Sequence, residues 1–200
     1  MIDVLVVDDH PAVRAGLAGL LRSEPGFRCP AAVGSAEAGI EAARRSAPRV
    51  VLADYELPDG DGLTLCSELK ALASAPGVIV YSAFARPRLL PAAAVAGADA
   101  MIDKGAPADE LFEAIRIIAR GGSLLPVPPR EVMERSYALL DTDEIVLFGM
   151  AINGAPPSEI AAISGDDPDE VRRQLRGLLE RLQASPTEPE APPTDGLSAR

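Results

Sequence analysis

The chain has 200 residues, of which 48% are hydrophobic, enough for one full core and a smaller appended unit. Its formal net charge of −11 opposes non-specific attraction to nucleic acid and to anionic membranes, because both require a basic surface. Its two cysteines lack the close spacing of a zinc or redox pair, and no signal-peptide pattern or bilayer-length apolar stretch is present, which favours a reduced, cytoplasmic setting.

Residues 1–120 have the pattern of one α/β domain, because short apolar runs alternate with longer segments of helical periodicity. The short runs predict strands at residues 2–7, 29–33, 49–53, 77–82 and 99–103. The longer segments predict helices at residues 12–24, 36–46, 62–74, 88–97 and 108–120. Pro91 must bend or shorten the fourth helix. Five such units with right-handed crossovers predict a doubly wound, five-stranded parallel sheet.

The composition changes after residue 120. Residues 121–137 carry glycines and prolines and are interpreted as a linker, although a helical pattern begins near Arg130. Residues 138–184 predict a small all-α unit, whose last helix has Asp167 as a candidate N-cap and Pro168 at its first position. Residues 185–200 are rich in proline and poor in large apolar groups, so we expect them to be disordered.

Acidic side chains follow two of the predicted strands at their carboxyl ends. Asp8 and Asp9 end the first strand, and Asp54 ends the third. Ligands of a doubly wound sheet bind beyond these strand ends, so the three carboxylates should meet there. Grouped carboxylates form a hard oxygen site that suits Mg²⁺. The alternative, a favourable charge at the N-terminus of the next helix, explains one of the paired aspartates better than two.

Ser82 and Lys104 end the fourth and fifth strands at the same edge. If Asp54 attacks a phosphoryl donor, the product is an aspartyl phosphate, and Mg²⁺ and Lys104 can offset the charge on its oxygens while Ser82 donates a hydrogen bond. Asp54 alone could simply open a turn, but its partners argue otherwise. Lys104 is one of only two lysines in the chain, which disfavours a mere surface charge. The residues therefore predict a phosphoryl acceptor.

Four separated motifs resemble one known family. VVDDHPAVRAGL, DYELPDGDGL, Ser82-Ala83 and GADAMIDKGA closely resemble the receiver domain of two-component response regulators, particularly the group with a LuxR-type helix-turn-helix output domain. The resemblance covers residue 2 to about residue 120 and agrees in identity, order and strand-end placement. It implies a flavodoxin-like fold and a sensor histidine kinase as the partner that phosphorylates Asp54.

The resemblance also implies a role for each polar residue at this edge. Asp9 would be the principal direct ligand of Mg²⁺, with Asp8 beside it, and the backbone carbonyl of Glu56 would complete the protein's share. Ser82 and Lys104 would bind the phosphoryl group and move the adjoining face of the domain.

Three residues near the site need separate treatment: Met101, Tyr81 and His10. Receivers usually carry an aromatic residue three positions before the lysine, whose rotamer couples to phosphorylation, but here that position is Met101. A flexible thioether fills either of two packings and specifies neither. Strand alternation should point Tyr81 away from the face of Ser82, so we do not assign it the missing role. His10 is the single histidine, and we expect it to be a partly exposed residue beside the site.

The C-terminal unit resembles a LuxR-type helix-turn-helix and also region four of sigma factors. GGSLLPVPPREVMER matches the usual exit from the last receiver helix, and residues 140–182 follow the helix order of such a domain. The last helix would be the recognition helix, which enters the major groove by its N-terminal residues. Arg172, Arg173 and Arg176 would contact phosphates or guanines, and a solvated arginine face is the alternative.

The charge of this unit argues against DNA. Residues 141–184 contain nine acidic side chains against four arginines, a balance of −5, and the recognition helix would begin with DDPDE. Ser164 and Asp166 also stand where the family prefers apolar core residues. Two hypotheses therefore stay open: a phosphorylation-controlled transcription regulator, whose dimer or altered face places these helices on DNA, and a response regulator whose helical domain binds a protein partner. An enzyme with the same carboxylates is disfavoured, since no catalytic insertion interrupts the receiver pattern.

Overall fold

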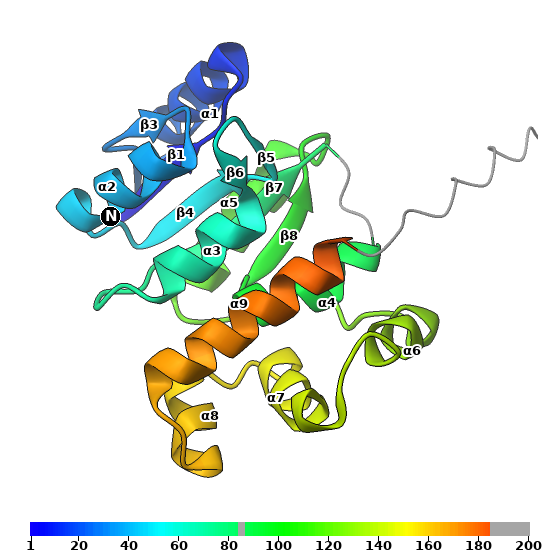
Figure 1. Cartoon of the computed structure of the whole chain (residues 1–200). Helices are drawn as coiled ribbons and strands as arrows, with labels where there is room; N and C mark the ends of the chain where they lie inside the picture. Colours follow the sequence, from blue (N-terminus) through cyan, green and yellow to red (C-terminus); the bar gives the residue numbers. More distant parts are fainter. Residues whose placement is uncertain (84–86, 185–200) are drawn as a thin grey trace, which may run out of the picture.

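The computed structural model describes residues 1–83 and 87–184 and contains a parallel sheet with helices on both faces (Figure 1). The strand order is β2-β1-β4-β7-β8, and β3 also pairs with β1. Every pairing within this sheet is parallel. Its strands are β1 Ile2–Val7, β2 Phe27–Arg28, β3 Ala32–Val33, β4 Val50–Asp54, β7 Gly77–Ser82 and β8 Ala100–Asp103. The doubly wound α/β fold expected from the sequence is confirmed.

The second strand differs from the expectation. The sequence predicts one strand at residues 29–33, whereas two short strands, β2 and β3, lie on either side of Pro30. Proline has no N–H to donate to a neighbouring strand, so the ladder is interrupted there. The Ala31 carbonyl still accepts a hydrogen bond from Val6 N at 3.2 Å, which keeps this segment beside β1.

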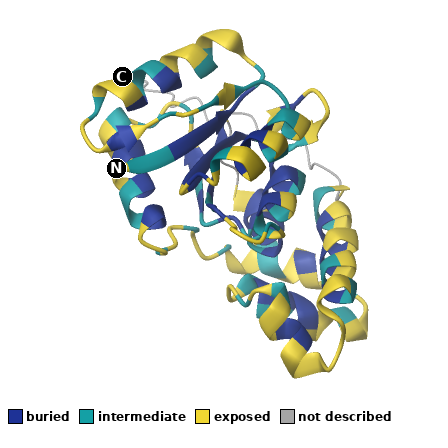
Figure 2. Cartoon of the chain, turned by 90° about the vertical axis from the view of Figure 1, so that its left-hand side faces the viewer, coloured by how far each residue is buried: buried dark blue, intermediate teal, exposed yellow. Residues whose placement is uncertain are grey.

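Two apolar layers cover the sheet. Helices α1 and α5 pack on one face, and α2, α3 and α4 pack on the other. Figure 2 shows the buried strands enclosed by helices whose outer faces are exposed. Pro91 lies in the first turn of α4, and Gly97 ends that helix with φ +80°, so α4 is short as expected. The helices are α1 Pro11–Ser23, α2 Ala36–Ser46, α3 Gly62–Lys70, α4 Leu90–Ala96 and α5 Ala108–Ala119, with a 3₁₀ turn, η1, at Pro87–Leu89.

A small hairpin follows β4 and leads into α3. Its antiparallel strands are β5 Glu56–Leu57 and β6 Gly60–Asp61. The Asp61 side chain caps α3 by accepting hydrogen bonds from Leu63 N and Thr64 N. This hairpin was not predicted from the sequence, whose turn-forming residues after Asp54 indicate only a turn.

Within the described residues, four helices follow the α/β unit, and the first, second and fourth of them contact α4. They are α6 Arg130–Tyr137, α7 Thr142–Ile152, α8 Pro157–Ser164 and α9 Pro168–Ala184. Asp167 caps α9 as expected, because its carboxylate accepts from Asp169 N at 2.8 Å. Helix α9 contacts α4 more extensively than it contacts α7 or α8, and the two helices lie side by side in Figure 1. Buried residues of α7, α8 and α9 belong to the same apolar cluster as α4.

Helix α6 lies inside the span that the composition marks as a linker. Residues 185–200, expected to be disordered, lie outside the described residues. Within the described ranges, no helix combines the length and the apolar character that crossing a membrane requires.

Candidate functional site

The carboxyl edge of the sheet brings the predicted acidic residues together. Asp8 and Asp54 are buried, with 2% and 4% of their surface exposed, and Asp9 is partly exposed. One side-chain atom from each of Asp8, Asp9, His10 and Asp54 lies within 4.8 Å of the others. The convergence of β1 and β4 that the strand pattern predicts is therefore present.

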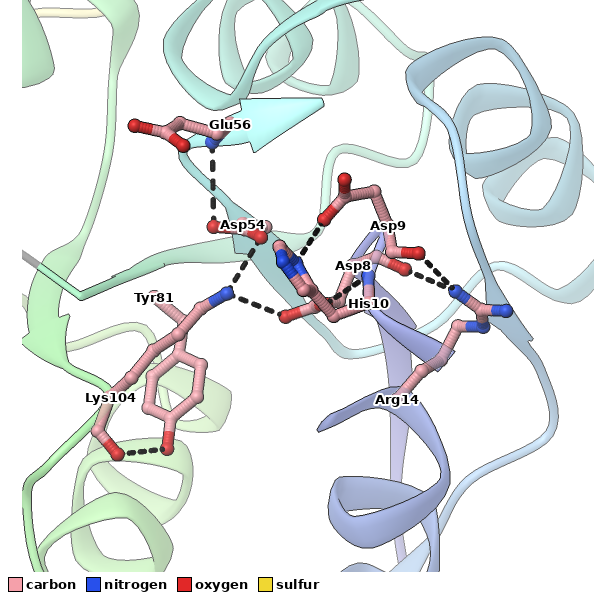
Figure 3. A network of polar contacts seen from close by, with 8 residues as sticks. All are labelled: Asp8, Asp9, His10, Arg14, Asp54, Glu56, Tyr81 and Lys104. Atoms are coloured by element: carbon pink, nitrogen blue, oxygen red, sulfur yellow. Dashed lines mark hydrogen bonds and ion pairs between the residues drawn. The ribbon is translucent and has the colours of Figure 1, made fainter. Parts of the chain in front are cut away.

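Lys104 bridges the two buried carboxylates (Figure 3). Its Nζ donates to Asp54 Oδ2 at 2.6 Å and to Asp8 Oδ2 at 2.8 Å. Burial opposes the charge of the ammonium, but its hydrogen bonds to Asp54 and Asp8 outweigh this cost and raise the pKa of Lys104. Burial also raises the pKa of the Asp54 carboxyl, since Lys104 only partly offsets the desolvation. The lysine thus holds two carboxylates that would otherwise repel each other.

Asp9 has a buried carboxylate oxygen that accepts no hydrogen bond among the described residues. This oxygen is Oδ1, and Nδ1 of the exposed His10 lies against it. A carboxylate oxygen without a donor is costly unless a cation approaches it. Arg14, which the sequence analysis did not single out, fixes the backbone here: its Nη1 donates to the carbonyls of Asp8 at 2.6 Å and Asp9 at 3.2 Å. Three carboxylates, one of them with an unsatisfied oxygen, form a donor set that fits a hard divalent cation.

Backbone geometry around Asp54 depends on a glycine. A Cβ at Gly62 would lie 2.3 Å from the Asp54 carbonyl oxygen, so no other residue fits without moving the main chain. Gly62 N also donates to the Tyr55 carbonyl at 2.8 Å. Glu56 N donates to Asp54 Oδ1 at 3.4 Å, which places Glu56 beside the carboxylate. The metal-ligand role of the Glu56 carbonyl stays a prediction.

The ends of β7 and β8 complete the edge. Ser82 is 5% exposed and lies opposite Asp103 in the register, and its carbonyl accepts from Lys104 N at 2.8 Å. Met101 is partly buried in the layer of α2, α3 and α4. Tyr81 lies in the opposite layer, as strand alternation predicts, and its hydroxyl donates to the Lys104 carbonyl at 3.1 Å. This hydrogen bond could not be predicted from the sequence, because it joins a residue of β7 to the residue that follows β8.

The three arginines proposed for DNA contact lie on α9, far along the chain from this edge. Arg172 and Arg173 form ion pairs with Asp169 and Glu170, three residues before them in the same helix. Arg176 is exposed. The acidic first turn of α9 therefore already neutralises part of the arginine face.

The last turn of α9 reaches the loop that follows Asp54. Gln183 Nε2 donates to Asp61 Oδ1 at 2.7 Å, and Gln183 also hydrogen-bonds the side chain of Tyr55, the residue after Asp54. These contacts span more than 120 residues of sequence, and the sequence analysis did not anticipate them. The fold and the carboxylate–lysine edge together define a flavodoxin-like receiver protein with helices docked on α4.

Comparisons with known proteins agree with this class. Residues 4–116 match the family described as the response regulator receiver domain. The chain is 34% identical to the transcriptional regulatory protein UhpA of Salmonella typhimurium over 188 residues, which cover 92% of this chain and 93% of UhpA. A LuxR-family two-component response regulator from Aurantimonas has a TM-score of 0.60 at 25% identity, covering 68% of this chain and 99% of that chain. RcsB of Salmonella enterica bound to a promoter has a TM-score of 0.58 at 21% identity, covering 90% and 91%, a likeness of fold.

The chain belongs to the family of two-component response regulators with a receiver domain. The resemblance to response regulators that the four sequence motifs indicate is therefore confirmed.

Proposed function

We propose that this response regulator is switched by phosphorylation of Asp54 from the phosphohistidine of a sensor histidine kinase. The observation that carries the proposal is the bridge from Lys104 to Asp8 and Asp54, which holds a buried carboxylate next to a cation at the carboxyl edge of the sheet. An oxygen of Asp54 forms a bond to phosphorus while the P–N bond of the donor breaks, and the electron pair leaves with the histidine nitrogen. Lys104 offsets charge on the transferring oxygens, and the Ser82 hydroxyl donates to one of them.

The acidic cluster is proposed to hold Mg²⁺ through Asp8, Asp9, Asp54 and the Glu56 carbonyl. Support comes from the three carboxylates that converge here and from the buried Oδ1 of Asp9, which accepts no hydrogen bond among the described residues. When bound, the metal would neutralise negative charge on the phosphoryl oxygens. Arg14 keeps the β1–α1 loop in place for this role by holding two of its carbonyls.

Intact-mass measurement tests the acceptor directly. The full chain is incubated with phosphoramidate and Mg²⁺, and we expect a gain of one phosphoryl group that chelation of the metal prevents. Asp54→Asn should abolish the gain, whereas the matched change Asp143→Asn, on exposed α7, should leave it intact. An unmodified wild-type chain, or a modified Asp54→Asn chain, would refute the assignment.

The helical region is proposed to act as a DNA-binding output domain of residues 138–184, joined by residues 121–137 to a receiver of residues 1–120. Support comes from the similarity to a transcriptional regulator over nearly the whole chain and from the helices α7 to α9. Arg172, Arg173 and Arg176 on α9 are the candidate contacts to phosphates or bases. A homodimer formed after phosphorylation would place two such helices on DNA.

A salt series tests this part. Retention of genomic DNA fragments by the full chain is measured at increasing salt, with and without phosphoramidate, for the wild type and for Asp54→Asn. Binding should weaken steeply with salt, strengthen with the phosphodonor and lose that gain in the variant. Phosphorylation of Asp54 without retention even at low salt would leave the receiver proposal standing and remove the DNA proposal.

A second output, docking on a protein partner, is favoured by one specific observation. Asp169 and Glu170 already pair with Arg172 and Arg173, so phosphates would have to displace carboxylates of the same helix. Replacing all three candidate arginines with glutamine separates the two outputs. Loss of DNA retention supports the first, and transcriptional control that survives the triple replacement supports the second.

A further inference from the structure

Two consecutive residues of β7 hold the main chain of Lys104. Ser82 O accepts from Lys104 N at 2.8 Å. The Tyr81 hydroxyl donates to Lys104 O at 3.1 Å, a contact drawn in Figure 3. The backbone of Lys104 is thus fixed on both sides of its Cα, at the point where β8 ends and the loop to α5 begins. A displacement of Lys104 that follows a change among the carboxylates therefore has to alter these two main-chain hydrogen bonds.

Tyr81 connects this anchor to other parts of the domain. It pairs with Asp54 in the register of β4 and β7, and with Ile102 in the register of β7 and β8. Its ring is 7% exposed and lies in the apolar layer with Phe112 of α5. The main chain of Tyr81 therefore lies beside the strand of the phosphoacceptor, while its side chain reaches the lysine loop and the layer beneath α5.

The residue at the usual aromatic position lacks these contacts. Met101 has no group that can donate a hydrogen bond, and it packs in the opposite layer, against α2, α3 and α4. Tyr81 is the aromatic residue whose polar group touches Lys104. Burial raises the pKa of the Tyr81 hydroxyl, so that hydroxyl keeps its proton and remains a donor at neutral pH.

We propose that Tyr81 is a positioning residue for Lys104, which holds the lysine over the carboxylates and passes a change at Lys104 to the layer beneath α5. The proposal rests on the phosphorylation of Asp54 proposed above. In the unmodified chain Lys104 Nζ is divided between Asp8 and Asp54. A phosphoryl group on Asp54 gives Nζ new anionic oxygens, and the resulting shift of Lys104 changes the hydrogen bond to the Tyr81 hydroxyl.

The composition makes the hydroxyl observable in the full chain, which has three tyrosines and no tryptophan. Tyrosines are labelled with carbon-13 at Cζ, the atom that carries the hydroxyl, and the signals are assigned with Tyr55→Phe, Tyr81→Phe and Tyr137→Phe. Spectra are recorded with Mg²⁺ before and after phosphoramidate. We expect the Tyr81 signal to shift on phosphorylation, and the Tyr137 signal, from α6, to stay in place.

Kinetics provide the second readout. Tyr81→Phe removes the hydroxyl and keeps the ring, so it should change the rate constants of phosphorylation or of phosphoryl loss by about 2- to 10-fold, the effect of one hydrogen bond. Tyr137→Phe is the control and should leave both rate constants unchanged. If Tyr81 had only a structural role, Tyr81→Phe would lower the unfolding midpoint without altering the rate constants of phosphorylation or of phosphoryl loss.

The outcomes distinguish a failure of the positioning role of Tyr81 from a failure of the proposed phosphorylation of Asp54. If the wild type takes up no phosphoryl group, the phosphoacceptor proposal fails first. If the wild type is phosphorylated but the Tyr81 signal does not move and Tyr81→Phe has wild-type rates, the positioning role is overturned. The labelled wild type answers the question even if Tyr81→Phe folds poorly.

Discussion

Opposite charges are paired in two regions of this molecule, but the two regions are built differently. At the carboxyl edge the partners Asp8, Asp54 and Lys104 lie at the ends of three strands that are far apart in sequence, and their side chains are 2%, 5% and 18% exposed. On α9 the partners lie three residues apart in one helix, and 70% of the Arg173 side chain is exposed. Buried pairs are costly to break and are oriented by the fold, whereas exposed local pairs contribute little and exchange readily. The receiver edge is therefore preorganised, while the arginine face of α9 is adjustable.

A substitution on the apolar side of α9 should have the largest effect on the free energy of unfolding, because this side packs α9 against the receiver. Leu178 is fully buried in the cluster shared with α4, so Leu178→Ala should lower the free energy of unfolding by about 2–5 kcal/mol. The neighbouring change Gly177→Ala, at an exposed helical site with open space around it, should raise it by about 0.5–1 kcal/mol. Urea unfolding of the full chain measures both. A loss below 1 kcal/mol for Leu178→Ala would mean that α9 is not part of the shared core.

Metal binding should stabilise the receiver edge and not the arginine face. With free Mg²⁺ at about 100 times its dissociation constant, the free energy of unfolding should rise by about 2.7 kcal/mol. Asp9→Asn replaces one carboxylate oxygen by an amide NH2 and removes the negative charge, so it should abolish most of this gain, whereas Asp143→Asn should keep it. Thermal unfolding with Mg²⁺ and with chelator measures the gain. The same increment in Asp9→Asn would contradict the assigned ligand set.

The charge of Asp54 should itself cost stability. Its pKa is raised by burial, which the hydrogen bond from Lys104 offsets only in part. A carboxyl with a raised folded-state pKa contributes stability that is present below its unfolded pKa and lost as the pH rises through the folded pKa. In metal-free buffer at neutral pH, Asp54→Asn should therefore be more stable than the wild type, and the difference should shrink toward acidic pH. A difference that does not vary with pH would point to packing rather than to charge.

The pairs on α9 should show the smallest effect on stability. The double change Asp169→Asn with Glu170→Gln should alter the free energy of unfolding by less than about 1 kcal/mol, since these are exposed pairs in the first turn. If the output binds DNA, freeing Arg172 and Arg173 should tighten retention and steepen its salt dependence. Glu180→Gln, farther along the same helix, is the matched control. Unchanged retention would favour the protein-docking alternative.

Much of the receiver could be predicted from the sequence, because its signals are local. Apolar runs and helical periodicity located the main strands and helices, and parallel topology then required Asp8, Asp9 and Asp54 to meet. The division of the second strand at Pro30 could have been anticipated from the missing N–H, yet strand length was judged from the apolar pattern alone. Arg14 gave no signal, because a helix-borne arginine on an acidic protein is usually a surface charge.

The contacts that join the two regions could not be predicted in the same way. The packing of α9 on α4 depends on two apolar stripes that each fit a helical pattern without naming a partner. The hydrogen bonds from Gln183 to Asp61 and from Tyr81 to Lys104 join polar groups far apart in sequence, and no periodicity specifies such pairs. The arginines of α9 could be identified from the sequence, and their pairing with Asp169 and Glu170 follows from the i,i+3 spacing of a helix, a signal on its polar face.

The apolar α4 helix has a consequence for how the chain is made. Buried residues cover most of its circumference because α9 lies on the side away from the sheet. During translation at about 5–20 residues per second, α9 would leave the ribosome roughly 4–18 seconds after α4. Throughout that interval the apolar surface of α4 in the nascent receiver would be exposed to solvent and available for binding by chaperones. A receiver cut off before α9 should accordingly aggregate where the complete chain remains dispersed.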